Sequence, residues 1–205
     1  MMTEFMDSLK IAALEFRLNI PREFSRTRGG LSIPSLLGFP YWQGMASISP
    51  SYHADAAYEV DLMRLERPGQ VFEVYDARFN GPRADPGGVE LGSASPVLAG
   101  VSSNNQSIQI SGLPSGYVIS PGDYVGWQNA DGTRALHRAR TGATASGGGI
   151  TPAFAVEGLV RPGTATGAAI TLVRPTCRAI ITEASYGRGR PLITDGASFN
   201  WQQTI

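Results

Sequence analysis

The sequence predicts a mainly β protein: an antiparallel β-sandwich or barrel with one short α-helix at about residues 53–66 and an N-terminal β-hairpin or arm. Beyond residue 96, short apolar runs bounded by turn residues recur about every ten residues, as in sandwiches and small barrels. The 205-residue chain has 25 glycines and 14 prolines, and only 17% of its residues are charged. This balance is typical of a β-rich chain with many turns and with surfaces that need not face water.

The first predicted element is an extended arm. Residues 10–28 read KIAALEFRLNIPREFSRTR, in which apolar residues alternate from Leu14 to Ile20. This period of two predicts a strand, and the polar continuation to Arg28 can return as the second strand of a long hairpin. Because a two-stranded hairpin buries little by itself, we expect the arm to lie on another surface.

A strand, a short helix and a second strand follow the arm. Residues 41–49 predict a partly buried strand. The next segment, SPSYHADAAYEVDLMRLERPG, has apolar residues at helical spacing, with Ser51 as a candidate cap and Pro68-Gly69 as the stop. Residues 71–76 then predict a strand with apolar residues on both faces.

The second half of the chain is predicted to be all strands. It follows residues 80–96, which are rich in turn formers and expected to be exposed. The predicted strands cover residues 97–101, 107–111, 117–127, 134–139, 153–157, 169–174, 178–183 and 198–204. We therefore expect an N-terminal β-rich part with the helix, residues 1–100, and a β-sandwich or barrel part, residues 101–205, either separate or as one continuous domain.

Charge and hydropathy exclude several classes of function. Seventeen basic side chains balance seventeen acidic ones, so no nucleic-acid-specific site is expected. The basic segments RALHRAR and GRGRP are short enough to be interface or solvated residues. The sequence also predicts no membrane span and no signal peptide, and synthesis in a cytoplasm is expected.

The candidate catalytic and metal-binding residues form no constellation. The two histidines are His53, just before the helix, and His137, expected on an exposed strand face; no G-x-S-x-G motif accompanies them. The lone Cys177 lies in an apolar strand and is expected to pack there. Asp76 and Asp85 lack calcium-loop spacing and are explained by turns. The remaining candidate carboxylates, which nothing in the sequence pairs, are Asp61, Glu66, Glu73 and Glu157. The sequence predicts no enzyme and no catalytic, cofactor-binding or metal-binding residue.

The segment GLPSGYVISPGDYVGWQNADGTRALHRART, residues 112–141, reads as scaffold. Ser120-Pro121-Gly122-Asp123 predicts a β-turn with proline at its second position. An aspartate at this place in a turn bonds nearby backbone N–H groups, so Asp123 is expected to be structural.

The order of these pieces resembles distal tail proteins, or related minor tail-tip proteins, of long-tailed bacteriophages. SGYVISPGDYVGW, ALHRARTGATASGGG and FAVEGLVRPGTATGAAITLVRP are similar to a succession found in that family, with Gly122 and Asp123 at its recurring Gly-Asp step. YWQGMASISP, the helix and RPGQVFEVYDARFNGPR are similar to its first half. The similarity spans about residues 41–186.

This resemblance implies a structural role in the virion. The family forms rings, usually hexameric, that join the tail tube to the baseplate hub and the side fibres. Its fold is a β-sandwich with a helix, and it has no catalytic residues to carry over. The partners implied are therefore further copies of this chain, the tail tube protein, the hub protein and the tail fibres, with the protein located at the tail tip after synthesis in the host cytoplasm.

Two alternatives stay open at the level of sequence. The chain can occupy another tail-tip or tail-completion position. It can also be a glycan-binding β-sandwich used in host recognition, in which Tyr124, Trp127 or Trp201 would stack on sugar rings. Tyr124 and Trp127 are three residues apart in one strand, so they are expected on opposite faces rather than on one platform.

Overall fold

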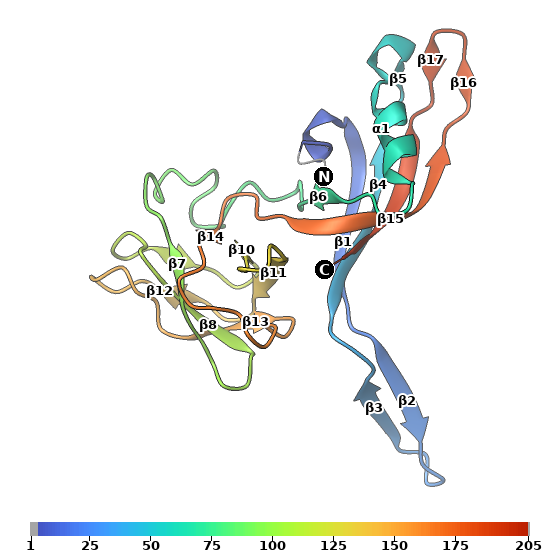
Figure 1. Cartoon of the computed structure of the whole chain (residues 1–205). Coiled ribbons are helices and arrows are strands. Elements are labelled where there is room, and N and C mark those ends of the chain that lie inside the picture. Colours follow the sequence, from blue (N-terminus) through green and yellow to red (C-terminus); the bar gives the residue numbers. More distant parts are fainter. Residues whose placement is uncertain (1–3, 205) are drawn as a thin grey trace.

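A computed structural model describes residues 4–204 and is mainly β, with antiparallel sheets and one α-helix, as predicted (Figure 1). The first sheet has the strand order β1–β4–β18–β15–β6. Its strands are β1 (Ile11–Asn19), β4 (Tyr41–Ile48), β6 (Phe72–Val74), β15 (Cys177–Tyr186) and β18 (Ala197–Gln203). The two C-terminal strands thus lie between strands from the first half of the chain.

The alternation seen in the sequence of β1 places its apolar side chains on the core side of this sheet. Phe16 is buried and packs against the rings of Trp42 and Trp201, with ring centroids 5.3 and 4.8 Å away. Phe5, which lies just before a 3₁₀ turn, η1 (Met6–Ser8), packs edge-on against Phe72. Aromatic rings therefore make up much of the first core.

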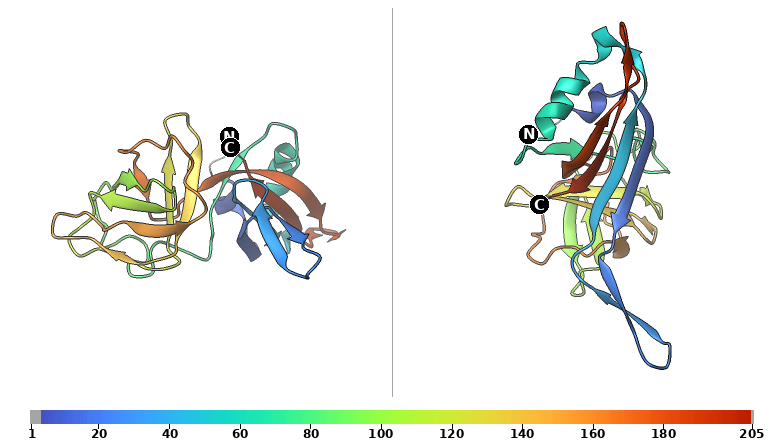
Figure 2. Two further views of the ribbon diagram at one scale, coloured as in Figure 1. Left: turned by 90° about the horizontal axis from the view of Figure 1, so that it is seen from below. Right: turned by 90° about the vertical axis from the view of Figure 1, so that its right-hand side faces the viewer.

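The predicted N-terminal hairpin is present but has other bounds than residues 10–28: it is made of β2 (Arg22–Arg26) and β3 (Ser32–Leu36), which pair antiparallel. It continues from β1 and β4 and projects from the body of the molecule, as both Figure 1 and the right-hand view of Figure 2 show. Every residue in its two strands is exposed.

The opposite end of the first sheet carries the helix. A 3₁₀ turn, η2 (His53–Asp55), precedes α1 (Tyr58–Leu65), which buries Tyr58, Leu62 and Leu65. Beside them β5 (Ser51–Tyr52), β16 (Gly189–Arg190) and β17 (Ile193–Thr194) form a small three-stranded sheet. Ser51 does not cap the helix: it pairs with Thr194 in this sheet, and neither η2 nor α1 has a side-chain cap.

The second sheet is a small barrel. Its strand order is β14–β10–β11–β13–β8–β7, and backbone hydrogen bonds between β7 and residues 167–170 close it on itself. Its strands are β7 (Val97–Val101), β8 (Ser107–Ser111), β10 (Tyr124–Gln128), β11 (Arg134–Ala139), β13 (Phe154–Glu157) and β14 (Ile170–Thr171); β9 (Val118–Ile119) and β12 (Ala143–Thr144) pair beside it. Closure removes the free strand edges of this sheet.

The two cores meet at β10 and β11. Tyr124 and Leu136 belong to the aromatic core of the first sheet, whereas Val125 and Trp127 belong to the barrel core. Because successive side chains of a strand point to opposite sides, one strand serves both cores, and Tyr124 and Trp127 lie on opposite faces as expected.

The two cores draw on different parts of the sequence. The core of the first sheet combines residues 5–74 with residues 177–201 and two barrel residues, whereas the barrel core is drawn from residues 98–172. The first core includes the end of the chain because the last two long strands pair with β4 and β6 rather than with the barrel. Local strand patterns do not encode which strands pair.

Candidate interaction surfaces

The residue types that could support catalysis or metal binding are scattered or already engaged in structure. Within residues 4–204, no group of three or more His, Cys, Asp or Glu side chains is arranged to hold a metal ion. No helix in this part of the chain is long and apolar enough to cross a membrane. Cys177 is completely buried, as predicted, and burial raises the pKa of its thiol.

His137 was expected on an exposed face, and this expectation is wrong. Its ring is buried, stacks on Trp127 with centroids 4.9 Å apart, and places Nδ1 3.2 Å from the carbonyl oxygen of Glu157. Burial lowers the pKa of His137 to about 4, and the positive charge of Arg161 acts in the same direction. The side chain is therefore neutral at physiological pH and serves as a packing element.

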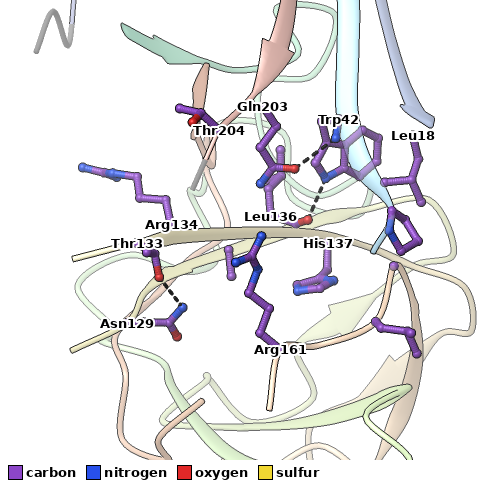
Figure 3. Close-up of a pocket in the computed structure, with 14 residues that line it drawn as sticks. Leu18, Trp42, Asn129, Thr133, Arg134, Leu136, His137, Arg161, Gln203 and Thr204 are labelled. Atoms are coloured by element: carbon purple, nitrogen blue, oxygen red, sulfur yellow. Dashed lines mark hydrogen bonds between the residues drawn. The ribbon is translucent and has the colours of Figure 1, made fainter. Parts of the chain in front are cut away.

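A small pocket beside His137 lies at the junction of the two sheets (Figure 3). A hydrogen bond crosses this junction: the indole Nε1 of Trp42 donates to the carbonyl of Leu136 at 2.7 Å. Within the first sheet, the backbone N–H of Trp42 donates to Oε1 of Gln203 at 3.0 Å. The polar groups drawn in Figure 3 thus include several that hold β4, β11 and β18 together. We assign this pocket a structural role.

The buried aspartates hold the backbone of loops. Asp123 accepts hydrogen bonds from the backbone N–H groups of Ser120 at 2.7 Å and Arg83 at 3.0 Å, which confirms its predicted structural role. Gly122 has φ +94°, the left-handed conformation that the predicted turn needs.

The turn-rich segment 80–96 is mostly exposed, as predicted, and it is organised around buried Asp85. Asp85 accepts bonds from the backbone N–H groups of Glu90 and Leu91, both at 2.9 Å, and from the Tyr117 hydroxyl at 3.0 Å. Burial by itself would raise the pKa of the Asp85 carboxyl, but these hydrogen bonds outweigh burial and lower it. Asp85 therefore ties the segment to the barrel.

Asp76 and the other candidate carboxylates have separate places. Asp76 is buried and binds the guanidinium of Arg78 through two 2.7 Å hydrogen bonds, while it also accepts from the Tyr124 hydroxyl at 3.0 Å. Glu73 in β6 pairs with Arg134 at 2.8 Å. The others are distributed over different elements: Asp61 on α1, Glu66 at its C-terminal end and Glu157 in β13.

The aromatic residues considered for sugar stacking are all buried. Tyr124 and Trp201 are in the aromatic core and Trp127 is in the barrel core. The expectation that one of them could present a platform for a sugar ring is therefore wrong, because a stacking residue must expose one face of its ring.

The most conspicuous exposed feature is the arm, which we define as residues 20–39. Its exposed apolar residues are Ile20, Phe24, Leu31, Ile33, Leu36, Leu37 and Phe39. Such a concentration of apolar side chains on a thin hairpin is unusual for a surface in contact with water alone, and it marks an interaction surface.

A second exposed apolar surface lies at the other end of the first sheet. We call it the helical end and define it as residues 51–67 and 186–196; its exposed apolar residues are Tyr52, Val60, Met63, Tyr186 and Leu192. By contrast, the barrel has only dispersed exposed apolar residues, such as Val118 and Ile150. The alternation at Leu14–Ile20 predicted β1, which leads into the arm, but residues 31–39 of the arm were not predicted. The helical end was not predicted either, because the short strands β16 and β17 were missed.

The first sheet and the barrel also differ in whether their outermost strands have a free edge. Within the described chain β1 pairs with β4 alone, so its outer edge has no strand partner, although Nη2 of Arg78 donates to the carbonyl of Phe16 there at 3.4 Å. In the barrel, β7 is bonded on its other side to residues 167–170. In the arm, backbone bonds from Leu37 to Pro21 and from Thr27 to Leu31 fix the hydrogen-bonding register. The alternation of this register turns the nitrogen of Pro34 outward, which removes a donor from the outer edge of β3. The outer edge of β2 has no such block.

Comparison with known proteins assigns no relationship. No protein-family model matches the chain, and no curated protein matches it at a significant level of similarity.

Proposed function

We propose that this chain is a self-assembling structural subunit of a bacteriophage tail tip: a ring-forming adaptor, of the distal tail type, that joins the tail tube to the baseplate hub and fibres. The observation that carries the self-assembly is the arm, a projecting hairpin whose seven large apolar side chains are exposed. The resemblance of residues 41–186 to tail-tip proteins supports the place in the virion.

The physical argument starts from the stability of the arm. A two-stranded hairpin is marginally stable in water by itself, so an exposed one that projects from the body of the molecule gains stability when it docks on a protein surface. The single molecule has two different apolar surfaces, the arm and the helical end, far apart along the first sheet (Figure 1). When each copy binds the next through two different surfaces, further copies can be added in the same way. The assembly closes into a ring if the rotation between neighbouring copies adds up to a full turn.

The first test replaces apolar side chains of the arm. The arm variant carries Phe24→Thr, Leu36→Thr and Leu37→Thr, which keep β propensity but remove apolar surface. Burial of one such side chain contributes about 1.5–3 kcal/mol, so we expect the concentration for half-assembly to rise at least about tenfold. Mass photometry and negative-stain electron microscopy over a concentration series measure this, with rings of six-fold symmetry expected for the unmodified chain.

A matched control separates the arm from general surface hydrophobicity. The barrel variant carries Val89→Thr, Val118→Thr and Ile150→Thr at three exposed apolar positions outside the arm. We expect it to assemble like the unmodified chain, and we expect all three proteins to have the same thermal unfolding midpoint as monomers. Equal assembly of the arm and barrel variants would contradict the role of the arm.

A further inference from the structure

We infer that the arm of one copy docks on the helical end of the next copy, so that subunits associate head to tail. This inference rests on the proposed self-assembly and specifies its contact. The helical end matches the arm in apolar character: Val60 and Met63 on α1 are 70% and 54% exposed, and Leu192 at the β16–β17 turn is 79% exposed. Among the described residues, these two surfaces account for most of the exposed large apolar side chains.

The arm has one apolar face suited to such a contact. The register places Phe24, Pro34 and Leu36 on one face, which they share with Arg22, Arg26 and Ser32. The guanidinium of Arg22 lies 5.2 Å from the centroid of the Phe24 ring on that face. Within the strands the other face carries Glu23, Ser25 and Ser35 around Ile33, and Leu37, which follows β3 and bonds to Pro21, continues this second face.

Charge selects the helical end over a second arm. The arm has three arginines and one glutamate and thus a net charge of +2. The helical end has five carboxylates, from residues 55, 59, 61, 66 and 195, and four arginines, and thus a net charge of −1. Opposite signs favour the head-to-tail contact, whereas two arms would repel each other.

The register gives a second reason against pairing between two arms. A symmetric antiparallel pairing of β2 with β2 of another copy would place Arg22 opposite Arg26 twice, around a central pair of Phe24 residues. Directly opposed like charges destabilise a strand pair. The outer edge of β3 is also a poor partner, because Pro34 offers no donor there.

The test mixes two variants that are each damaged on a different surface. The helix variant carries Val60→Lys and Met63→Lys, which keep helix propensity and place positive charge where the positive arm would dock. The arm variant is the one described above. We expect each variant alone to remain monomeric over a concentration range in which the unmodified chain assembles.

An equimolar mixture of the two variants distinguishes the docking from loss of folding. The helix variant keeps an intact arm and the arm variant keeps an intact helical end, so the mixture should form a heterodimer and nothing larger. Mass photometry with one variant enlarged by a fused marker protein identifies the species. Circular dichroism and the thermal midpoint of each variant confirm that both are folded.

The outcomes separate this inference from the proposed function. If the unmodified chain assembles but the helix variant assembles equally well, or if the mixture stays monomeric, the docking on the helical end is wrong and self-assembly stands. If the unmodified chain is monomeric at every concentration, the proposed self-assembly is wrong, and the docking with it. The barrel variant should assemble normally throughout.

Discussion

Single buried polar residues hold much of the irregular backbone of this protein. Asp123 and Asp85 each accept hydrogen bonds from two backbone N–H groups. These N–H groups lie in turns, where no neighbouring strand accepts their hydrogen bonds. His137 differs, because its ring is buried, stacks on Trp127 and places Nδ1 3.2 Å from the carbonyl oxygen of Glu157. Its contribution to stability therefore depends on its protonation state.

The pH dependence of stability should report the burial of His137. The unfolded chain takes up a proton at this residue near pH 6.5, whereas the pKa in the folded chain is lowered to about 4. The unfolded state thus binds more protons between these values, and the free energy of unfolding should decrease as the pH falls from 6.5 to 4, by about 3 kcal/mol from this residue. Urea unfolding at pH 7, 5.5 and 4.5 measures the effect.

Two variants make that measurement specific. His137→Phe keeps an aromatic ring against Trp127 and should lose this part of the pH dependence. His53→Gln changes the other histidine, which is exposed, and should retain the behaviour of the unmodified protein. An identical slope in the His137→Phe variant would show that another group is responsible.

At the scale of elements, close approach of strands decides which residues are tolerated. Gly44 in β4 lies against β1 so closely that an added Cβ would overlap the carbonyl oxygen of Glu15 and lie 2.9 Å from the Trp201 ring. Gly44 thus allows β1 and β18 to flank β4 on both sides. Its backbone needs no left-handed conformation, so the constraint is one of space alone.

Substitution of Gly44 should therefore be costly. We expect Gly44→Ala to lower the free energy of unfolding by about 3 kcal/mol, because the clash is with backbone that cannot rotate away. Gly38→Ala is the matched control, since nothing lies within 4 Å of a Cβ built there. Chemical unfolding of the two variants measures the difference; a cost for Gly44→Ala no larger than for Gly38→Ala would contradict the close packing of β1 on β4.

At the scale of the whole molecule, the chain returns to complete its first sheet. The strands β15 and β18 are made last, yet β18 lies between β4 and β15 and joins the two halves of the sheet. The barrel is inserted between these two parts of the sequence and has its own core. The first sheet can therefore form only when the chain is nearly complete.

Removal of the C-terminal strands should affect the two cores differently. In a chain that ends at residue 175, β1 and β4 form a hairpin with no further partner. Their amides should therefore exchange with solvent at least about a hundredfold faster than in the full chain. The barrel strands β8 and β13 should keep their protection, because their core is drawn from residues 98–172. Hydrogen exchange followed by mass spectrometry measures both; protected amides in β1 and β4 would contradict this dependence.

Local structure in this protein was largely predictable from sequence. The alternation at Leu14–Ile20, the helical spacing before Pro68-Gly69 and the turn at Ser120–Asp123 each gave the correct element, because short-range sterics and periodicity set these choices. The packing of Cys177 also followed from its apolar neighbours.

The tertiary structure decided what local pattern cannot encode. Burial of His137 and Asp85, closure of the barrel and the short hairpin β16–β17 all depend on which distant segments meet. The same holds for the return of β15 and β18 to the first sheet and for the two apolar surfaces at its ends. A strand's sequence determines which side chains share a face, whereas the partner of that face is set by the free energy of packing the whole chain.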